Sequence, residues 1–515
     1  MRLIQTIGLT IFTMCLLLFI FSLSMSNYKL TQESFTSSIT NTQHQEVLTP
    51  ALADMMNKDY ASKFAFINDF NGAFNKVNEE LKANEEWNKV MYANYTFPIV
   101  KNSSIGPLND LLMPMFIICF ILSCIGALMY ILPKANDGPA GIKHNHIFFS
   151  SMKNRGAIGI ITGTLLILFY IYLYKKPEYI TNWVLMLDPL SYKLNGGEAD
   201  QWFLYGVLYC LAMVVMGIRM LMKYRHSKYQ QIRTYSVIFF QLAFAFTIPQ
   251  ILKRLNMPSY DLKSAWPLEY TFFFDYRLDE HIQAGTIGLF MIGWGIALFL
   301  IGVPLFTYLF GKRWYCSWVC GCGGLAETFG DPYRQLSDKS LKAWQIERWL
   351  VHAVLVFAVI MTAAVAYHWY SGEQKLLGID AYKIRDNYGF MIGFVFAGVV
   401  GTGFYPLMGN RMWCRFGCPL AAYLGMVQKF KSRFRITTNG GQCISCGNCS
   451  TYCEMGIDVK WYAQRGQNII RSSCVGCGVC SAVCPRGVLN LENADEPGRY
   501  NEPITVGKDG WTIQN

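Results

Sequence analysis

Long apolar runs alternate with shorter polar stretches along most of the 515 residues. A transmembrane helix needs about 20 consecutive apolar residues, and eight runs approach or exceed that length. They lie at residues 4–24, 111–132, 156–174, 202–222, 234–251, 285–310, 349–370 and 389–408. The pattern predicts an α-helical polytopic membrane protein of about eight spans. No A-x-A-like cleavage site follows the first run, so we expect residues 1–24 to act as an N-terminal membrane anchor.

One long polar segment, residues 25–110, separates the first two apolar runs. Its apolar residues recur mostly at intervals of three and four, which predicts helices. They are Leu52, Met55, Met56, Phe64, Ile67, Phe70, Phe74, Val77 and Leu81. The segment carries no cysteine and no motif of known chemistry, so we expect a small helical interaction module.

The charges of the polar stretches predict the topology. Residues 133–155 hold four basic and one acidic residue, 219–233 hold five basic and none acidic, and 409–435 hold six basic and none acidic. The alternate stretches, 175–201 and 252–284, each carry one more acidic than basic residue. The positive-inside rule then places both termini in the cytoplasm and residues 25–110 outside.

Composition supports the membrane class. The chain is 52% hydrophobic and 15% charged, whereas soluble domains average roughly 25% charged residues. A net charge of +11 would suggest nucleic-acid binding in a soluble protein. Here the basic residues gather at one membrane face, so we expect lipid and no nucleic acid as a partner.

Two cysteine runs near the C-terminus share the spacing C-x2-C-x2-C-x3-C. The first contains Cys443, Cys446, Cys449 and Cys453, and the second contains Cys474, Cys477, Cys480 and Cys484, followed by Pro485. This is the ligand pattern of a bacterial ferredoxin with two 4Fe-4S clusters, in which the fourth thiolate of each run ligates the other cluster. We therefore assign one cluster to Cys443, Cys446, Cys449 and Cys484, and the other to Cys474, Cys477, Cys480 and Cys453.

Zinc is the alternative ligand of C-x2-C pairs, since eight thiolates suffice for two tetrahedral sites. The x3 spacing, the Cys484-Pro485 pair and the duplicated half favour iron–sulfur clusters instead. The sequence thus predicts a C-terminal α+β, bacterial-type two-cluster ferredoxin domain at residues 437–490, followed by a tail at 491–515.

A second group of cysteines belongs to an internal repeat within the membrane domain, residues 111–436. Gly311-Lys-Arg-Trp-Tyr-Cys316-Ser-Trp-Val-Cys320 aligns with Gly409-Asn-Arg-Met-Trp-Cys414-Arg-Phe-Gly-Cys418. Each copy follows a glycine-rich span of the same direction, which predicts a parallel repeat with closely packed helices. On a helix, each C-x3-C would place two thiols on one face. We expect Cys316, Cys320, Cys414 and Cys418 to converge at the cytoplasmic membrane boundary.

Four converging thiols have three chemical uses. They can hold a third metal centre, most simply another iron–sulfur cluster, or bind copper, since soft thiolates favour both. They can also cycle between dithiol and disulfide. Packing alone explains the duplicated spacing poorly. Cys322 adds a fifth thiol in the first copy only, so a five-thiol site stays open.

Basic residues adjoin both C-x3-C motifs: Lys312 and Arg313 in one copy, Arg411 and Arg415 in the other. Two interpretations fit these residues. They anchor the chain at the cytoplasmic membrane face, or they adjust the potential of a nearby anionic cluster or guide a quinone head group. Residues 429–435 form a basic amphipathic strip that we expect at the lipid surface.

Several spans, two C-x3-C motifs and a C-terminal two-cluster ferredoxin together resemble the membrane polyferredoxins of the NosR, NapH and CcoG type. The resemblance covers about residues 155–490, and the stretch Asp188-Pro189-Leu190 is similar to that family as well. It implies electron transfer at a bacterial cytoplasmic (inner) membrane. Four features depart from the family pattern. Cys320 lacks a following proline, and Glu454 follows Cys453. Residues 25–110 are short and hold no flavin-attachment motif, and they match no known part of the family.

Two functions follow from this resemblance. The first is an oxidoreductase-like electron-transfer subunit, resembling a quinol dehydrogenase, that connects quinol or a cytoplasmic donor with a membrane or periplasmic redox partner. The second is a CcoG-like assembly factor that reduces copper for a respiratory oxidase or another copper enzyme. A redox sensor with residues 25–110 as its input domain is a third reading.

Overall fold

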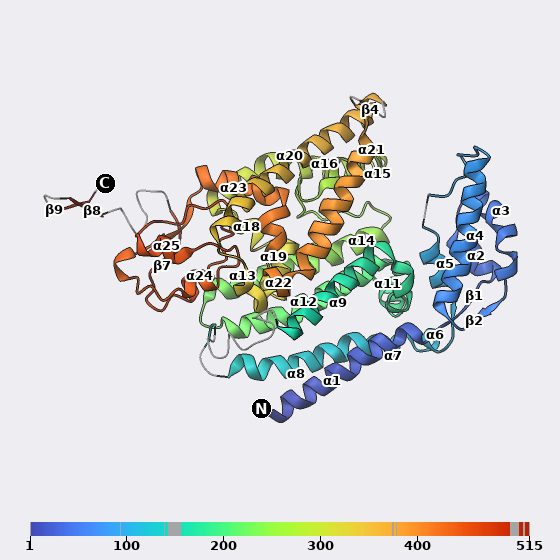
Figure 1. Ribbon diagram of the computed structural model, residues 1–515, viewed down its shortest axis with the longest axis horizontal. Helices are drawn as coiled ribbons and strands as arrows, with labels where there is room; N and C mark the ends of the chain where they lie inside the picture. Colours follow the sequence, from blue (N-terminus) through green and yellow to red (C-terminus); the bar gives the residue numbers. More distant parts are fainter. Residues whose placement is uncertain are drawn as a thin grey trace. The chain divides into compact units, whose positions relative to one another are not determined.

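The computed structural model describes residues 2–92, 94–137, 140–142, 156–372, 375–376, 378–494, 504–507 and 510–513 (Figure 1). The chain folds into two compact units. One comprises Met1–Lys134 and Ile171–Leu211, and the other comprises Ala135–Tyr170 and Ala212–Asn515. Beyond residue 494, only β8 (Ile504–Gly507) and β9 (Gly510–Ile513) of the predicted tail are described, and most of the loop 138–155 also lies outside the described residues.

Seven helical stretches in the described part of the chain are long and apolar enough to cross a membrane. They are Arg2–Ser24, Leu112–Asn136, Ala157–Lys175, Gln201–Lys223, Lys228–Arg254, Thr286–Phe310 and Leu341–Ser371. These stretches coincide with the first seven predicted spans and confirm a helical membrane protein. The eighth predicted span, 389–408, lies in a helical run made of α21 (Ala381–Tyr388), the π-helix η10 (Gly389–Gly403) and α22 (Tyr405–Met408). The count of eight stays a prediction.

Close helix packing in the first unit depends on small residues. The span helix α1 (Arg2–Phe21) continues into η1 (Ser22–Ser24). The second span is built from α7 (Leu112–Phe116), the π-helix η3 (Ile117–Leu122) and α8 (Ser123–Asn136). A Cβ atom on Gly126 would lie 2.9 Å from the carbonyl oxygen of Gly8. Glycine is therefore required where the two backbones meet.

The segment after α1 is a small mixed domain with its own core. Its helices are α2 (Gln32–Ser38), α3 (Thr42–Ala51), η2 (Ala53–Met55), α4 (Lys63–Ala83), α5 (Thr96–Asn102) and α6 (Pro107–Asp110). A three-stranded antiparallel sheet, in the order β2-β1-β3, joins β1 (Asn27–Lys29), β2 (Asp59–Tyr60) and β3 (Ser104–Ile105). The helical spacing does not predict this sheet, whose strands are only two or three residues long. Phe64 is 65% exposed, whereas Ile67 and Phe70 are fully buried.

Buried charges tie this domain to the segment after the third span. That segment contains η5 (Pro177–Ile180), α10 (Thr181–Leu185) and α11 (Asp188–Leu194). Lys101 lies 2.9 Å from the Asp188 carboxylate and 3.0 Å from that of Glu198, and Asp188 also accepts the Ala199 N–H at 2.8 Å. Asp188, the first residue of the family-like Asp-Pro-Leu stretch, is therefore a partner of a buried lysine.

The second unit carries the repeated motifs. Its helices before the first motif include α9 (Ala157–Lys175) and α12 (Gln201–Lys223), both shared with the first unit, then α13 (Lys228–Phe239), η6 (Phe240–Thr247), α14 (Ile248–Arg254), η7 (Tyr270–Phe273) and α15 (Asp275–Gln283). The first repeat span follows as α16 (Thr286–Ala297), the π-helix η8 (Leu298–Gly302) and α17 (Val303–Phe310). The long helix α20 (Leu341–Ser371) and the short pair β4 (Lys375–Leu376) and β5 (Ile379–Asp380) separate it from the second repeat span. Both repeat spans thus contain a π-helical segment.

A two-stranded antiparallel sheet closes the C-terminal domain. Strand β6 (Phe434–Thr438) pairs with β7 (Leu489–Asn493), from Phe434 opposite Asn493 to Thr438 opposite Leu489. Between them lie η12 (Gly440–Gln442) and three short helices, α24 (Asn448–Thr451), α25 (Val459–Gln464) and α26 (Val479–Ala482). Because β6 precedes and β7 follows both cysteine runs, their pairing brings the two ends of this domain together.

Each repeat span ends at a glycine in the left-handed region, Gly311 with φ +70° and Gly409 with φ +89°. A Cβ atom on Gly409 would also lie 2.7 Å from the backbone nitrogen of Ser337. By contrast, nothing lies within 4 Å of a Cβ atom built on the helical Gly293. These two glycines form a matched pair for substitution.

We expect Gly409→Ala to destabilise the protein by about 1–3 kcal/mol, because alanine must adopt a strained backbone and meet Ser337. Gly293→Ala should leave stability unchanged or raise it by up to about 1 kcal/mol. Thermal unfolding of both variants in detergent, followed by tryptophan fluorescence, measures the difference. Equal unfolding temperatures would contradict the role given to Gly409.

Candidate functional site

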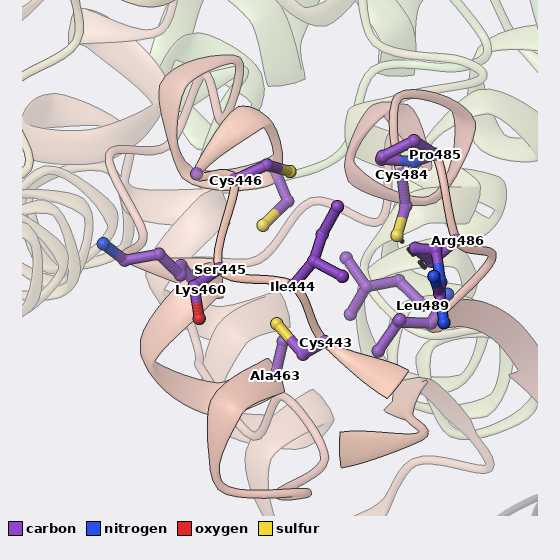
Figure 2. A pocket seen from close by; sticks show the side chains of 13 residues that line it. Cys443, Ile444, Ser445, Cys446, Lys460, Ala463, Cys484, Pro485, Arg486 and Leu489 are labelled. Carbon is purple, nitrogen blue, oxygen red and sulfur yellow. Dashed lines mark hydrogen bonds between the residues drawn. The ribbon is translucent and has the colours of Figure 1, made fainter. Parts of the chain in front are cut away.

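Four cysteines of the C-terminal domain line one cavity, which we call the distal site. They are Cys443, Cys446, Cys449 and Cys484, and the cavity measures about 350 Å³ with the solvent at its mouth included. Figure 2 shows the side chains of Cys443, Cys446 and Cys484 around this space, with Lys460 and Arg486 on its lining. These are the four residues that the spacing assigns to one cluster. That they hold iron stays a prediction.

The other four cysteines line a second cavity, the proximal site. They are Cys453, Cys474, Cys477 and Cys480, around a space of about 370 Å³ counted in the same way. Cys453 belongs to the first cysteine run and the other three to the second. The crossing of the fourth cysteine therefore occurs in both halves.

The two runs adopt the same backbone geometry. Left-handed φ values recur at one constant offset: Ser445 +60° and Gly476 +61°, Gly447 +80° and Gly478 +74°, Gly456 +65° and Gly487 +64°. Ser445 is the one member of these pairs that is not glycine. The fourth sulfur of each run accepts a backbone N–H four residues later, Cys453 from Ile457 at 3.4 Å and Cys484 from Val488 at 3.3 Å. Such hydrogen bonds to ligand sulfurs are one way in which a protein sets the potential of a cluster.

The distal and proximal sites differ in their access to solvent. Cys446 is exposed and its neighbour Ile444 is 56% exposed. Cys474 and Cys480 are only 9% and 8% exposed. The distal site therefore faces solvent, whereas the proximal site lies deeper in the fold.

The repeated C-x3-C motifs bring four further thiols together in what we call the span-end site. Cys316, Cys320, Cys414 and Cys418 are each 6% or 7% exposed and belong to one apolar core. Burial and then the charges of the Cys414, Cys320 and Cys316 thiols raise the pKa of Cys418 well above its ordinary value. The two motifs thus lie in one buried core, and that their four thiols form one site stays a prediction.

The local geometry of each motif differs from the prediction of two thiols on one helical face. Cys316 ends the short helix α18 (Arg313–Cys316), and Cys414 lies in the π-helical turn η11 (Trp413–Gly417). The second cysteine of each pair is extended and caps a new helix: Cys320 for α19 (Gly321–Glu327) and Cys418 for α23 (Pro419–Lys431). The expectation of one continuous helix is wrong because the chain turns between the two thiols.

A backbone N–H of the following helix favours a negative charge on each of these second sulfurs, but at Cys418 burial and the neighbouring thiolates outweigh it and its pKa is raised. The Cys418 sulfur accepts the Ala421 N–H at 3.4 Å. For Cys320, a hydrogen bond from the Cys322 thiol, together with the Gly323 N–H, outweighs burial and lowers its pKa to about 6. Cys322 is therefore a neighbour of the span-end site that stabilises the Cys320 thiolate.

The spacing of the sulfurs bears on the kind of metal centre. Four thiolates on one tetrahedral ion lie about 3.8 Å apart, given metal–sulfur bonds of about 2.3 Å. In the described part of the chain, the one group of three metal-ligand side chains whose ligand atoms all lie within 4.8 Å of one another is Glu327, Glu454 and Cys477. The thiols of all three sites are thus spread more widely than one ion requires. All 17 cysteines are free thiols.

Buried basic residues surround the span-end and proximal sites. Lys312, Arg411 and Arg415 are 2%, 1% and 4% exposed. Arg415 pairs with Glu347 at 2.6 Å, while Arg411 donates to the Cys414 sulfur at 3.7 Å and to the Cys316 carbonyl at 3.1 Å. Arg313, which is less buried, lies over the Phe434 ring at 4.0 Å. All of these contacts are with protein groups.

Sequence reasoning missed two members of this environment, Glu327 and Arg334. Both are buried, and Arg334 donates to the Cys477 sulfur at 3.8 Å. Burial alone would raise the pKa of Glu327, but Arg233, Arg334 and Arg411 hold it well below its usual value. Glu454, in the position after Cys453, was the one available signal. Because three guanidinium groups already surround the carboxylates, the group of Glu327, Glu454 and Cys477 is not suited to a metal ion.

Comparisons with known sequences match the same regions. A sequence family described as a 4Fe-4S dicluster domain matches residues 435–485. A family described as a 4Fe-4S binding domain matches twice, at residues 292–340 and 388–437. The two matches of the second family cover the two repeat copies.

Curated relatives also match part of the chain. The putative electron transport protein YccM of Escherichia coli (strain K12) is 27% identical over 170 residues, 32% of this chain and 47% of that protein. Protein NirI of Paracoccus denitrificans (strain Pd 1222) is 29% identical over 171 residues, 31% of this chain and 24% of NirI. The methylamine utilization ferredoxin-type protein MauN of Methylobacillus flagellatus is 27% identical over 157 residues, 29% of this chain and 50% of MauN. The matches thus span half or less of each of these three relatives, and no solved structure matches.

Proposed function

We propose that this chain, a membrane 4Fe-4S electron-transport protein of the polyferredoxin type, carries electrons through three four-thiol sites. Its partners would be quinol or a cytoplasmic donor on one side and a membrane or periplasmic acceptor on the other. One observation carries the proposal: all cysteines of the distal, proximal and span-end sites except the exposed Cys446 pack in or against a single continuous core.

The chain's own residues suit the two C-terminal sites to a pair of 4Fe-4S clusters. Each site collects four sulfurs around its own cavity, and the matching left-handed turns give both loops the same shape. When bound, such clusters accept and release single electrons at potentials that depend on hydrogen bonds and exposure. The protein contributes the thiolates and the N–H donors, and at the proximal site it also excludes water.

A third 4Fe-4S cluster is the occupant that best fits the span-end site. The 4Fe-4S binding family matches both repeat copies there, and the sulfurs are spread too widely for one tetrahedral ion. The Cys320 sulfur, which accepts the Gly323 N–H, lies where a thiolate is stabilised. The match to the 4Fe-4S binding family favours a cluster over the dithiol and copper readings. A copper-reducing assembly factor remains the alternative function.

The distal site is the natural entry point for a soluble redox partner, because Cys446 and Ile444 are exposed there. Lys460 and Arg486 line this opening, and Arg465 stacks on the 43% exposed Trp461 at 4.1 Å. Asp458 is the nearby exposed carboxylate on the same stretch. A positively charged rim around an exposed apolar centre suits an acidic carrier protein. By the positive-inside rule, this face lies on the cytoplasmic side of a bacterial inner membrane.

The metal content of anaerobically purified protein tests the proposal. We expect about twelve irons per chain, falling to about eight in a Cys414→Ser, Cys418→Ser variant, because only the span-end cluster is lost. Cys210→Ser, which alters a buried cysteine within a span, is the matched control and should keep all twelve. About eight irons in the unaltered protein, with copper lost in the double variant, would support the assembly-factor alternative instead.

Charge reversal tests the entry point. In a Lys460→Glu, Arg486→Glu variant, reduction by an acidic flavodoxin should slow several-fold at low ionic strength, and the difference should vanish at high salt. Lys429→Glu, Lys431→Glu reverses two exposed charges elsewhere and should have little effect. Photoreduced deazaflavin, a small neutral donor, should reduce all three proteins alike. Equal flavodoxin rates in all three would contradict docking at the distal site.

A further inference from the structure

Five buried charged side chains form a connected group that we call the charge bridge: Arg233, Arg334, Arg411, Glu327 and Glu454. Glu327 lies 2.7 Å from Arg233, 2.6 Å from Arg334 and 2.8 Å from Arg411. Glu454 lies 2.9 Å from Arg334 and 3.1 Å from Arg411. All five side chains are at most 4% exposed. Water therefore screens these charges very little.

The charge bridge touches two of the four-thiol sites. Arg334 donates to the sulfur of Cys477 in the proximal site at 3.8 Å. Arg411 donates to the sulfur of Cys414 in the span-end site at 3.7 Å. Both arginines bind the same two carboxylates, so a chain of direct ionic contacts runs from one site to the other. Asp331, 3.4 Å from Arg334, also binds Arg219 and Lys223 and adds a further anchor on one side.

The chain positions these groups through the cysteines themselves. Glu327 ends α19, the helix that Cys320 caps, and Glu454 directly follows Cys453 of the proximal site. Arg411 lies three residues before Cys414. A simple anchor between two parts of the fold would not need hydrogen bonds to the ligand sulfurs. Because these charged groups adjoin cysteines of both sites, a change of charge at one site acts on the electrostatic potential at the other.

We propose that the charge bridge sets the reduction potentials of the proximal and span-end sites together. An added electron makes a cluster more negative, and a guanidinium hydrogen-bonded to a ligand sulfur stabilises that state. Arg334 and Arg411 thus raise the two potentials, while the shared carboxylates lower both. The net charge of the five groups is positive, which favours electrons on these two sites over the distal site. This inference rests on the proposed clusters.

Opposite charge changes give opposite predictions. Glu327→Gln removes a carboxylate that contacts both arginines, so the potentials of both sites should rise. Arg411→Gln removes a cation at Cys414, so the potential of the span-end site should fall. Each shift should correspond to at least a tenfold change in the equilibrium constant for reduction, about 59 mV for one electron. Redox titration of the full-length protein, followed by the EPR signals of its clusters, measures both.

Control variants distinguish an effect on the reduction potentials from a merely structural role of the charged residues. Arg411→Lys keeps the charge and should restore most of the Arg411→Gln shift. Arg385→Gln, which alters an arginine paired with Asp275 and Asp386, should shift neither potential. If Arg411→Gln does not fold, Glu454→Gln replaces it, with a predicted rise at both sites. Shifts of the same sign in the Glu327 and Arg411 variants, or no shift in either, would overturn the inference.

Failure of the proposed function would look different. If the unaltered protein shows no signal from a span-end cluster, the third cluster is refuted. The Glu327→Gln shift of the proximal signal would still decide whether the charge bridge tunes that site. Absence of every iron–sulfur signal would refute the proposed function and this inference together.

Discussion

The second unit is organised by one requirement. The proximal site and the span-end site must each collect their sulfurs from two segments that are distant in the sequence. The proximal site needs Cys453 from one run and three thiols from the next. The span-end site needs one cysteine pair from each repeat copy. Left-handed glycines at Gly311 and Gly409 turn the chain out of the two spans. Pairing of β6 with β7 closes the loops that carry the eight thiols of the distal and proximal sites.

Gathering thiolates in a buried region creates an electrostatic demand. Under the proposed function, several negative sulfurs and clusters that become more negative on reduction are buried there, and such burial requires compensating charge. The fold meets this demand with arginines held in place by carboxylates rather than with arginines alone. Arg411 and Arg334 reach the sulfurs, and Glu327 and Glu454 fix their positions. The helix N-termini at Cys320 and Cys418 add to the same effect.

Sequence spacing predicts the features that depend on local chain geometry. The grouping of Cys484 with the first run and of Cys453 with the second follows from the length of each loop, and the first seven spans follow from hydropathy. The turn before Cys320 and Cys418 could not be read from spacing, because C-x3-C also fits a continuous helix. The short strands of the small mixed domain at residues 25–110 escape detection because two or three residues carry no period. Glu327 and Arg334 escape detection because their partners are contributed by three separate segments.

The central claim is that three four-thiol sites hold three iron–sulfur clusters within one core. A cryo-EM map of the anaerobically prepared protein tests it most directly. The account predicts three compact densities, each bonded to four sulfurs, with Cys316, Cys320, Cys414 and Cys418 around the third. A single-ion density or a disulfide among these four cysteines, or a C-terminal domain with two single-metal sites, would contradict it.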